Sequence, residues 1–436
     1  MPPPSSITGT DREASREGRA PLRAWLATPT AMVLVALLLR VAALTVGHTY
    51  RFNPVSDNFG FGWESGRIAR ALAAGEGFSS PFHGNTGPTA WVAPLYPYLI
   101  AGVFKLFGVY SRGSAWILLA LNSLFSALTC WSMYRLADET VGRRVARWAG
   151  WTWALLPYAM YWAIRWVWET NFSALLLSLA LLITLRIERK PRLVTWLLLG
   201  AIWGVIALAN PSCLSLLPFS AAWLAWRCGR QRRAWLGGGL AAAAVCLALV
   251  APWTIRNYRV FGSLVPIRSN FGVELRLGNS PSAQGLWMSW FHPSQDPREF
   301  ARYRQMGELA YGRARRQEAM DFIRENPGRF AELCVRRALW FWIGTPRSST
   351  IDPSSALRNS LFLLSSVLAF WGLVLVIRDR QRGAWLYALA LLVYPAVYYL
   401  TFAHPRYRHP IEPEMVILGL YLLATTLPEP APRSDA

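Results

Sequence analysis

Long apolar runs separated by short Arg-rich segments dominate the pattern of this 436-residue chain. About 20 largely apolar residues are needed for a helix to cross the hydrocarbon of a bilayer, and many of the runs approach that length. They predict an all-α polytopic membrane protein with about ten transmembrane helices, which we place near residues 29–47, 113–136, 146–163, 171–187, 193–209, 212–227, 234–252, 359–377, 384–402 and 412–427.

The Arg clusters predict how the chain is threaded. Clusters precede the first run and then follow in every second loop, at 135–147, 186–192, 227–233 and 378–382. Short cytosolic loops carry an excess of Lys and Arg. We therefore expect a multi-pass protein of the cell (inner) membrane with both termini in the cytosol. The expected parts are a cytosolic tail (1–28), a transmembrane core (29–252), an extracytoplasmic loop region (253–358), C-terminal transmembrane helices (359–427) and a cytosolic tail (428–436).

This threading leaves a first outer loop, 48–112, on the extracytoplasmic side. An amphipathic helix is expected over Trp63–Ala74, lying on the membrane surface, with Ile68 and Leu72 on its apolar face and Arg67 and Arg70 displaced from that face. The apolar stretch LYPYLIAGVFKLFG, 95–108, is short and interrupted by proline, so we expect a re-entrant or interfacial helix there rather than a span.

A long outer loop, 253–358, precedes the last three spans. It is expected to hold a helical region near 297–325, a turn at Asn326-Pro327-Gly328 and a helix rich in Arg and aromatic residues. Because this segment is poor in core-forming residues, we expect it to lie over the bundle.

Composition agrees with a membrane protein, since 53% of residues are hydrophobic and 16% are charged. The net charge of +21 does not indicate a nucleic-acid partner, because the Arg residues stand in short clusters between apolar runs instead of along one polar face.

Three acids on the expected outer side are candidate catalytic groups: Asp57, Glu64 and Glu169. A carboxylate at the interface can accept a proton from a hydroxyl, and partial burial raises its pKa into the range of a general base. The alternatives are an ion pair of Glu64 with Arg67, a turn cap at Asp57, and a helix cap by Glu169. Asp57 and Glu169 are also the candidate ligands of a divalent cation, Mg or Mn, although no complete metal site is assigned.

Two cationic groups are candidates for binding a lipid phosphate. Arg256 and Arg268 follow a span directly, and Arg406, Tyr407 and Arg408 stand between two prolines in HPRYRHP. Arginine can bind a phosphate with two parallel hydrogen bonds. Arg256 and Arg268 could instead extend to lipid headgroups without a specific role. Arg40, inside the first apolar run, is expected to be a packing residue.

Several segments, taken in order, resemble the membrane glycosyltransferases of the C-type fold, which include the family 39 protein O-mannosyltransferases and the lipid A aminoarabinose transferase. The segments are ARALAAGEGF, PLYPYLIAGVFKLFG, WETNFSALLLSL and RYRHPIEP. The matching stretch TGPTAWVAP lacks the Lys that the aminoarabinose transferase carries there.

The resemblance implies an inverting transfer of a sugar from a polyprenyl-phosphate carrier to a lipid, glycan or protein acceptor at the outer membrane face. Asp57 or Glu64 would be the base, and Glu169 would hold the acceptor or a metal. Arg406 and Arg408, with Arg256 and Arg268, would neutralise the phosphate. A lipid or lipid-linked-sugar flippase and a non-catalytic assembly subunit are the alternatives.

Overall fold

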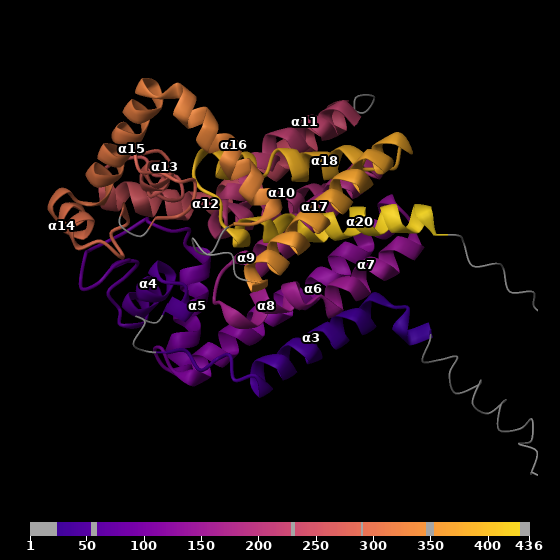
Figure 1. Ribbon diagram of the computed structural model, residues 1–436, viewed down its shortest axis with the longest axis horizontal. Coiled ribbons are helices and arrows are strands. Elements are labelled where there is room, and N and C mark those ends of the chain that lie inside the picture. Colours follow the sequence, from indigo (N-terminus) through magenta and orange to yellow (C-terminus); the bar gives the residue numbers. More distant parts are fainter. Residues whose placement is uncertain (1–23, 54–58, 228–231, 289–290, 346–352, 428–436) are drawn as a thin grey trace, which may run out of the picture.

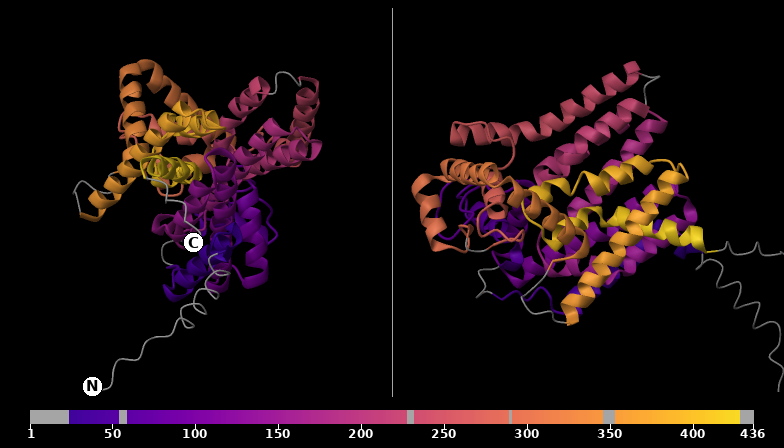
Figure 2. Two further views of the ribbon diagram at one scale, coloured as in Figure 1. Left: turned by 90° about the vertical axis from the view of Figure 1, so that its right-hand side faces the viewer. Right: turned by 45° about the horizontal axis from the view of Figure 1, so that its top comes forward.

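The structure is a computed structural model that describes residues 24–53, 59–227, 232–288, 291–345 and 353–427 (Figures 1 and 2). In this part of the chain, α-helices form nearly all of the regular structure, accompanied by short 3-10 helices and two isolated bridges, Ser79 with Pro88 and Leu286 with Ala403. The expectation of an all-α fold is confirmed.

The α-helices are α3 (Pro29–Val46), α4 (Glu64–Ala73), α5 (Leu95–Phe107), α6 (Arg112–Thr140), α7 (Arg143–Leu155), α8 (Pro157–Arg165), α9 (Thr170–Arg189), α10 (Leu193–Ala209), α11 (Leu217–Arg227), α12 (Arg232–Phe261), α13 (Phe271–Gly278), α14 (Pro297–Met306), α15 (Glu308–Glu325), α16 (Pro327–Ile343), α17 (Pro353–Arg378), α18 (Ala384–Leu392), α19 (Ala396–Leu400) and α20 (Glu412–Thr426). Two 3-10 helices, η3 (Pro211–Leu216) and η6 (Pro405–Ile411), matter for the site.

Each predicted span coincides with a helix or with two consecutive helices. Of the helices in the described ranges, five are long and apolar enough to cross a membrane: α3, α6, α9, α12 and α17. Prolines explain two of the broken spans. Leu156, before Pro157, is extended and separates α7 from α8, and Pro395 separates α18 from α19. In both places the structure has two shorter helices where we expected one continuous span.

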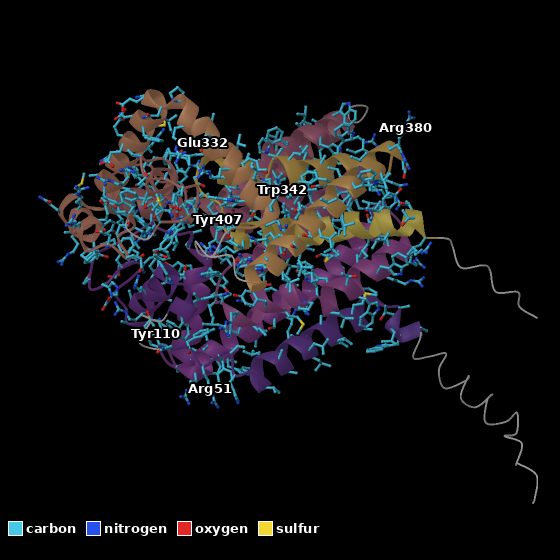
Figure 3. All side chains as sticks on the ribbon, viewed as in Figure 1. Arg51, Tyr110, Glu332, Trp342, Arg380 and Tyr407 are labelled. Atoms are coloured by element: carbon cyan, nitrogen blue, oxygen red, sulfur yellow. The ribbon has the colours of Figure 1, made fainter. Side chains whose placement is uncertain are left out.

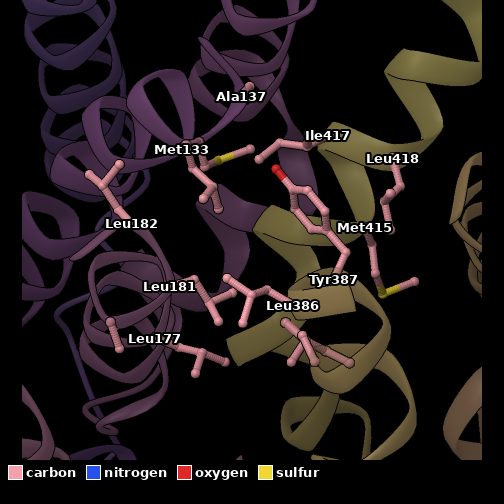
Figure 4. Close-up of a cluster of buried hydrophobic side chains, with 14 of the residues drawn as sticks. Met133, Ala137, Leu177, Leu181, Leu182, Leu386, Tyr387, Met415, Ile417 and Leu418 are labelled. Atoms are coloured by element: carbon pink, nitrogen blue, oxygen red, sulfur yellow. The ribbon is translucent and has the colours of Figure 1, made fainter. Parts of the chain in front are cut away.

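Large buried apolar side chains hold the bundle together. Leu177 and Leu181 of α9 pack in one cluster with Met133 of α6, Leu386 of α18 and Leu418 of α20 (Figure 4). Leu and Ala are the commonest members of this cluster, which also contains Trp and Tyr side chains.

Arg40 is a fully buried charged residue inside the bundle, and its surroundings confirm a packing role. Its guanidinium donates to the carbonyls of Ala36, Trp153 and Ala154 and to Ser126 Oγ, at 2.9 to 3.2 Å. Trp153 and Ala154 lie in the last turn of α7, where a helix leaves carbonyls without intrahelical partners. Arg40 therefore donates hydrogen bonds to carbonyl groups that the break before Pro157 leaves without helical partners.

The two long outer loops gather at one end of the bundle, opposite the last turn of α20 (Figure 1). Arg380, in an Arg cluster predicted to be cytosolic, lies at the other end (Figure 3). In the first loop, α4 and α5 pack against each other, and α5 has 13 residues, about 20 Å at 1.5 Å per residue, too short to cross a bilayer.

One expectation for α4 was wrong. The helix ends before Gly75 as predicted, but Arg67 is only 6% exposed instead of being displaced from the buried face. Its guanidinium lies 3.4 Å from the Pro81 carbonyl and 3.4 Å from His83 Nε2. The loop that follows α4 folds back over this side of the helix, which a helical periodicity cannot reveal.

The second outer loop does not merely lie over the bundle, since it shares a core with the first loop. Phe82 and Trp91 of the first loop pack with Val273 of α13, Tyr303 of α14 and Phe402 before η6. The predicted helices α14, α15 and α16 are present, with Asn326 before α16.

A buried carboxylate and a guanidinium bind the loops to one another. Glu308 of α15 accepts hydrogen bonds from Thr89 Oγ1, from Ala90 N at 2.7 Å, from Ser269 Oγ at 2.7 Å and from Tyr303 OH at 3.0 Å. Arg256, at the end of α12, donates to the carbonyls of Thr89 and Phe78 at 2.6 and 2.8 Å.

Candidate active site

A cavity of about 410 Å³ lies where the outer loops meet the ends of the bundle helices. Its walls come from the start of α4, the turn before α9, the connection from α12 to α13 and the connection from α19 to η6. Tyr407 marks this junction in Figure 3. The charged and histidine side chains that line it are Glu64, Glu169, Glu274, Arg268, Arg406, His292 and His404.

A close backbone approach brings the first acid near the second. The amide of Val167 donates to the Gly60 carbonyl at 3.1 Å. A Cβ atom at Gly62, where φ is +83°, would lie 2.6 Å from the Val167 carbonyl oxygen. Only glycine permits both this φ and this contact. The turn before α4 therefore rests on the turn before α9, and Glu64 and Glu169 line the same cavity.

Glu64 has the ionisation behaviour of a general base. It is the first residue of α4, and its side chain is 16% exposed. Burial, helped by the negative charge of Glu274, raises its pKa to about 7, although a backbone hydrogen bond and the charge of Arg406 act in the opposite direction. A carboxylate that titrates near neutral pH is suited to accepting and releasing a proton.

His292 directs an N–H group toward Glu64. The backbone N–H of Ser294 donates to His292 Nδ1 at 3.2 Å, so Nδ1 is an acceptor and the proton of the neutral ring is on Nε2. His292 Nε2 lies 3.7 Å from Glu64 Oε1. Burial, together with the charge of Arg67, lowers the pKa of His292 to about 3, so the ring is neutral at physiological pH.

Glu169 does not make the hydrogen bond that the helix-capping alternative requires. It precedes α9 as the N-cap residue, but its side chain makes no capping hydrogen bond. The carboxylate lines the cavity instead, and its negative charge contributes to the raised pKa of Arg406.

Arg406 is a partly buried cation that lies against aromatic rings. Its guanidinium carbon lies 4.2 Å from the centre of the Trp168 ring, and Nη2 donates to Tyr407 OH at 3.4 Å. Burial lowers its pKa, but Tyr407, Glu169 and Glu274 outweigh that effect and the net shift is upward. Among the described carboxylates, none lies within 4.0 Å of its nitrogens, which leaves donors available for an anion.

Arg268 and Tyr407, two of the candidate phosphate-binding residues, also line the cavity. Arg268 follows α12 and lies near Glu274, since its charge opposes the raised pKa of that acid. The Tyr407 ring stacks on Tyr398 with centroids 4.3 Å apart, and its carbonyl accepts from Tyr394 OH at 2.9 Å. These contacts fix the backbone beside Arg406.

Two predicted phosphate-binding residues, Arg408 and Arg256, make other contacts and do not line the cavity. Arg408 points away from the cavity, where it is paired with Glu412 at 3.1 Å and lies 3.6 Å from the centre of the Phe362 ring. The 3-10 geometry of η6 explains this, because Arg406 and Arg408 are two residues apart and leave the helix on different sides. Arg256 binds the Thr89 and Phe78 carbonyls and does not line the cavity.

Asp57 lies outside the described residues, so its proposed role stays a prediction. Within the described ranges, no group of three or more His, Cys, Asp and Glu side chains is arranged to hold a metal ion. Glu169 lines the cavity without such a set around it.

Sequence reasoning missed Glu274, Asn270 and His292. Glu274 and Asn270 belong to α13 and its N-cap, a short helix that we did not predict within the second outer loop. Their apolar neighbours in NFGVELRLG carry a helical period, with Phe271, Leu275 and Leu277 around the acid, and that signal could have located Glu274. His292 shows no such local signal.

Comparisons with known proteins identify related sequences and folds. Residues 91–255 match the family model described as dolichyl-phosphate-mannose-protein mannosyltransferase. A search of curated proteins found no match. The matched segment contains Glu169 but neither Glu64 nor Arg406.

Solved structures of membrane glycosyltransferases are among the matches to this chain. The Archaeoglobus fulgidus oligosaccharyltransferase tethered with an acceptor peptide has a TM-score of 0.50 and 13% identity over 91% of this chain and 50% of its own, so this chain spans about half of its length. Its complex with Zn and sulfate has a TM-score of 0.49, 14% identity and coverages of 91% and 49%. ArnT from Cupriavidus metallidurans bound to undecaprenyl phosphate has a TM-score of 0.40, 14% identity and coverages of 92% and 78%. The resemblance to membrane glycosyltransferases of the C-type fold is confirmed.

Proposed function

We propose that this chain, a membrane glycosyltransferase of the C-type fold, transfers a sugar from a polyprenyl-phosphate carrier to an acceptor hydroxyl in the 410 Å³ cavity. The observation that carries the proposal is the presence of one titratable carboxylate, Glu64, and two cations, Arg268 and Arg406, in the same buried space. The family description names a polyprenyl-type phosphate sugar as donor, which agrees with this set of groups.

The groups divide the reaction between them. Glu64 takes the proton from the acceptor hydroxyl while the oxygen of that hydroxyl forms a bond to the anomeric carbon of the sugar. The bond from that carbon to the phosphate oxygen breaks, and its electron pair stays on the lipid phosphate. Arg406 and Arg268 stabilise the negative charge that develops there. Attack opposite the leaving phosphate inverts the anomeric carbon.

His292 is a positioning residue for Glu64. Its Nε2–H faces Oε1 at 3.7 Å, which favours the ionised carboxylate without giving a proton to it. The resulting orientation leaves Oε2 to meet the acceptor hydroxyl.

A divalent cation, Mg or Mn, belongs to the proposal only as a group that Glu169 and Asp57 would hold. It would orient the acceptor and withdraw charge from it. The steps above are assigned to residues of the chain and none passes through the metal.

The Arg clusters of the short loops support an extracytoplasmic location for the reaction. Because the Arg clusters predict which loops are cytosolic, the cavity belongs to the extracytoplasmic face of the membrane. The acceptor is a lipid, glycan or protein hydroxyl on that side.

The test is transfer by the purified full chain in lipid nanodiscs, supplied with polyprenyl-phosphate hexoses and an extract of envelope glycolipids. We expect release of polyprenyl phosphate by the wild type, and a loss of about 100-fold or more in Glu64→Gln. Glu76→Gln, an exposed acid just after α4, is the matched control and should keep the wild-type rate. Release that is absent in the wild type across all donors, or that is equal in Glu64→Gln, would overturn the proposal.

A further inference from the structure

An amide and a carboxylate on α13 form a pair of hydrogen-bond acceptors in the cavity wall. Asn270 Nδ2 donates to Glu274 Oε1 at 2.9 Å, one helical turn away. Only the amide nitrogen can donate to a carboxylate, so Asn270 Oδ1 is left as an acceptor. Both residues line the cavity.

Asn270 Oδ1 has no donor from the protein, and Glu274 forms no ion pair with a described cation. Asn270 is 3% exposed, and its Oδ1 has no hydrogen-bond partner. Asn270 is the N-cap residue of α13 but makes no side-chain capping bond, so capping does not explain an asparagine there. Among the described cations, none lies within 4.0 Å of the Glu274 carboxylate. A buried acceptor without a donor costs free energy, and such groups are commonly completed by a ligand.

The chemistry of the pair selects a ligand group that donates hydrogen bonds. A phosphate offers acceptors and negative charge, so Glu274 repels it, and Arg406 and Arg268 take that part of a sugar phosphate. The sugar ring offers adjacent hydroxyl donors. Trp63 and Trp287 stand at the same cavity with ring centroids 5.4 Å apart, and they supply apolar surface for the C–H face of a sugar.

We propose that Asn270 and Glu274 are the subsite that binds adjacent hydroxyl groups of the sugar carried by the polyprenyl phosphate. This inference rests on the proposed function and adds a substrate class to it, namely a neutral sugar with two neighbouring hydroxyls. A uronic acid is excluded, because its carboxylate would lie against Glu274. The donor sugar is favoured over an acceptor glycan, because the charge of Arg406, assigned to the carrier phosphate, acts directly on Glu274.

Binding of two carriers to the full chain in nanodiscs tests the subsite. The probes are a short-chain polyprenyl phosphate alone and the same carrier bearing glucose, mannose, galactose or glucuronic acid, with no acceptor present. We expect the wild type to bind at least one hexose-bearing carrier about 10-fold or more tightly than the bare carrier. Asn270→Leu and Glu274→Gln should each lose that preference and bind the bare carrier as the wild type does.

Gln317 and Asp321 provide a matched control. They form the same amide-to-carboxylate pair, at 2.8 Å and one turn apart, on the exposed face of α15. Gln317→Leu and Asp321→Asn should keep the hexose preference.

Each other outcome has a distinct meaning. The subsite is overturned if the Asn270 and Glu274 variants keep the preference, if they lose affinity for the bare carrier equally, or if the wild type shows no preference among carriers that it binds. Tighter binding of the glucuronic acid carrier than of every hexose also overturns it. Failure of the proposed function looks different, because the wild type would then bind no polyprenyl phosphate at all.

Discussion

The raised pKa of Glu64 predicts that one substitution changes the pH dependence of stability. Burial shifts this pKa from 4.5 to about 7. This difference in pKa corresponds to about 3 kcal/mol, because a pKa change of one is worth about 1.36 kcal/mol. For a group whose folded pKa is raised, the stability is fully present below pH 4.5 and is lost as the pH rises through about 7. Glu64→Gln removes the ionisation, so it should abolish that loss.

Thermal unfolding of the detergent-solubilised chain between pH 5 and pH 8 measures this effect. We expect Glu64→Gln to resemble the wild type at pH 5 and to be more stable at pH 8 by up to about 3 kcal/mol. Glu76→Gln, which changes an exposed acid in the same loop, should follow the wild type at every pH. If the wild-type and Glu64→Gln curves stay parallel across this range, the carboxylate is not buried in its charged form and the reasoning fails.

Four further substitutions separate the roles of the site residues. Arg406→Gln should weaken binding of a polyprenyl phosphate about 10-fold or more, measured by fluorescence titration, while the unfolding midpoint stays close to that of the wild type. Arg408→Gln should do the reverse and destabilise the fold by about 3 kcal/mol, because it breaks a buried ion pair and leaves Glu412 with His409 alone; equal carrier loss in both variants would contradict the assignment. His292→Phe should move the acidic limb of the pH–rate profile upward, because Glu64 loses a nearby N–H, and an unmoved limb would remove the positioning role. Glu308→Leu should lower the unfolding free energy by about 3 kcal/mol, since several buried donors lose their acceptor, and a change below about 1 kcal/mol would refute that role.

The order and approximate positions of the apolar helices could be predicted because membrane spans leave a strong local signal. About 20 apolar residues with Arg clusters between them define a helix without reference to any neighbour. The finer breaks were also readable in principle, since Pro157 and Pro395 each interrupt a predicted span. The ends of the helices are less local, because α12 continues to Phe261 in a polar region that packs against the first outer loop.

The site was only partly predictable, because the direction in which a side chain points decides whether the residue lines the cavity. Arg406 and Arg408 are nearly equivalent in sequence, yet one enters the cavity and the other pairs with Glu412. Glu64 was identified from its place after the first span, but its pKa depends on burial and on Glu274, which is 210 positions away. Such contacts between distant segments leave no periodic pattern.

The shared carboxylate of Glu308 has a consequence for engineering and for divergence among relatives. Because Thr89, Ser269 and Tyr303 all depend on it, the two outer loops cannot be exchanged independently. A chimera that takes only one loop from a relative would leave a hydrogen-bond acceptor or donor without its partner where the two loops meet. Changes in specificity are therefore expected to arise by substitutions within the joined loops, or by transfer of both loops as a single module.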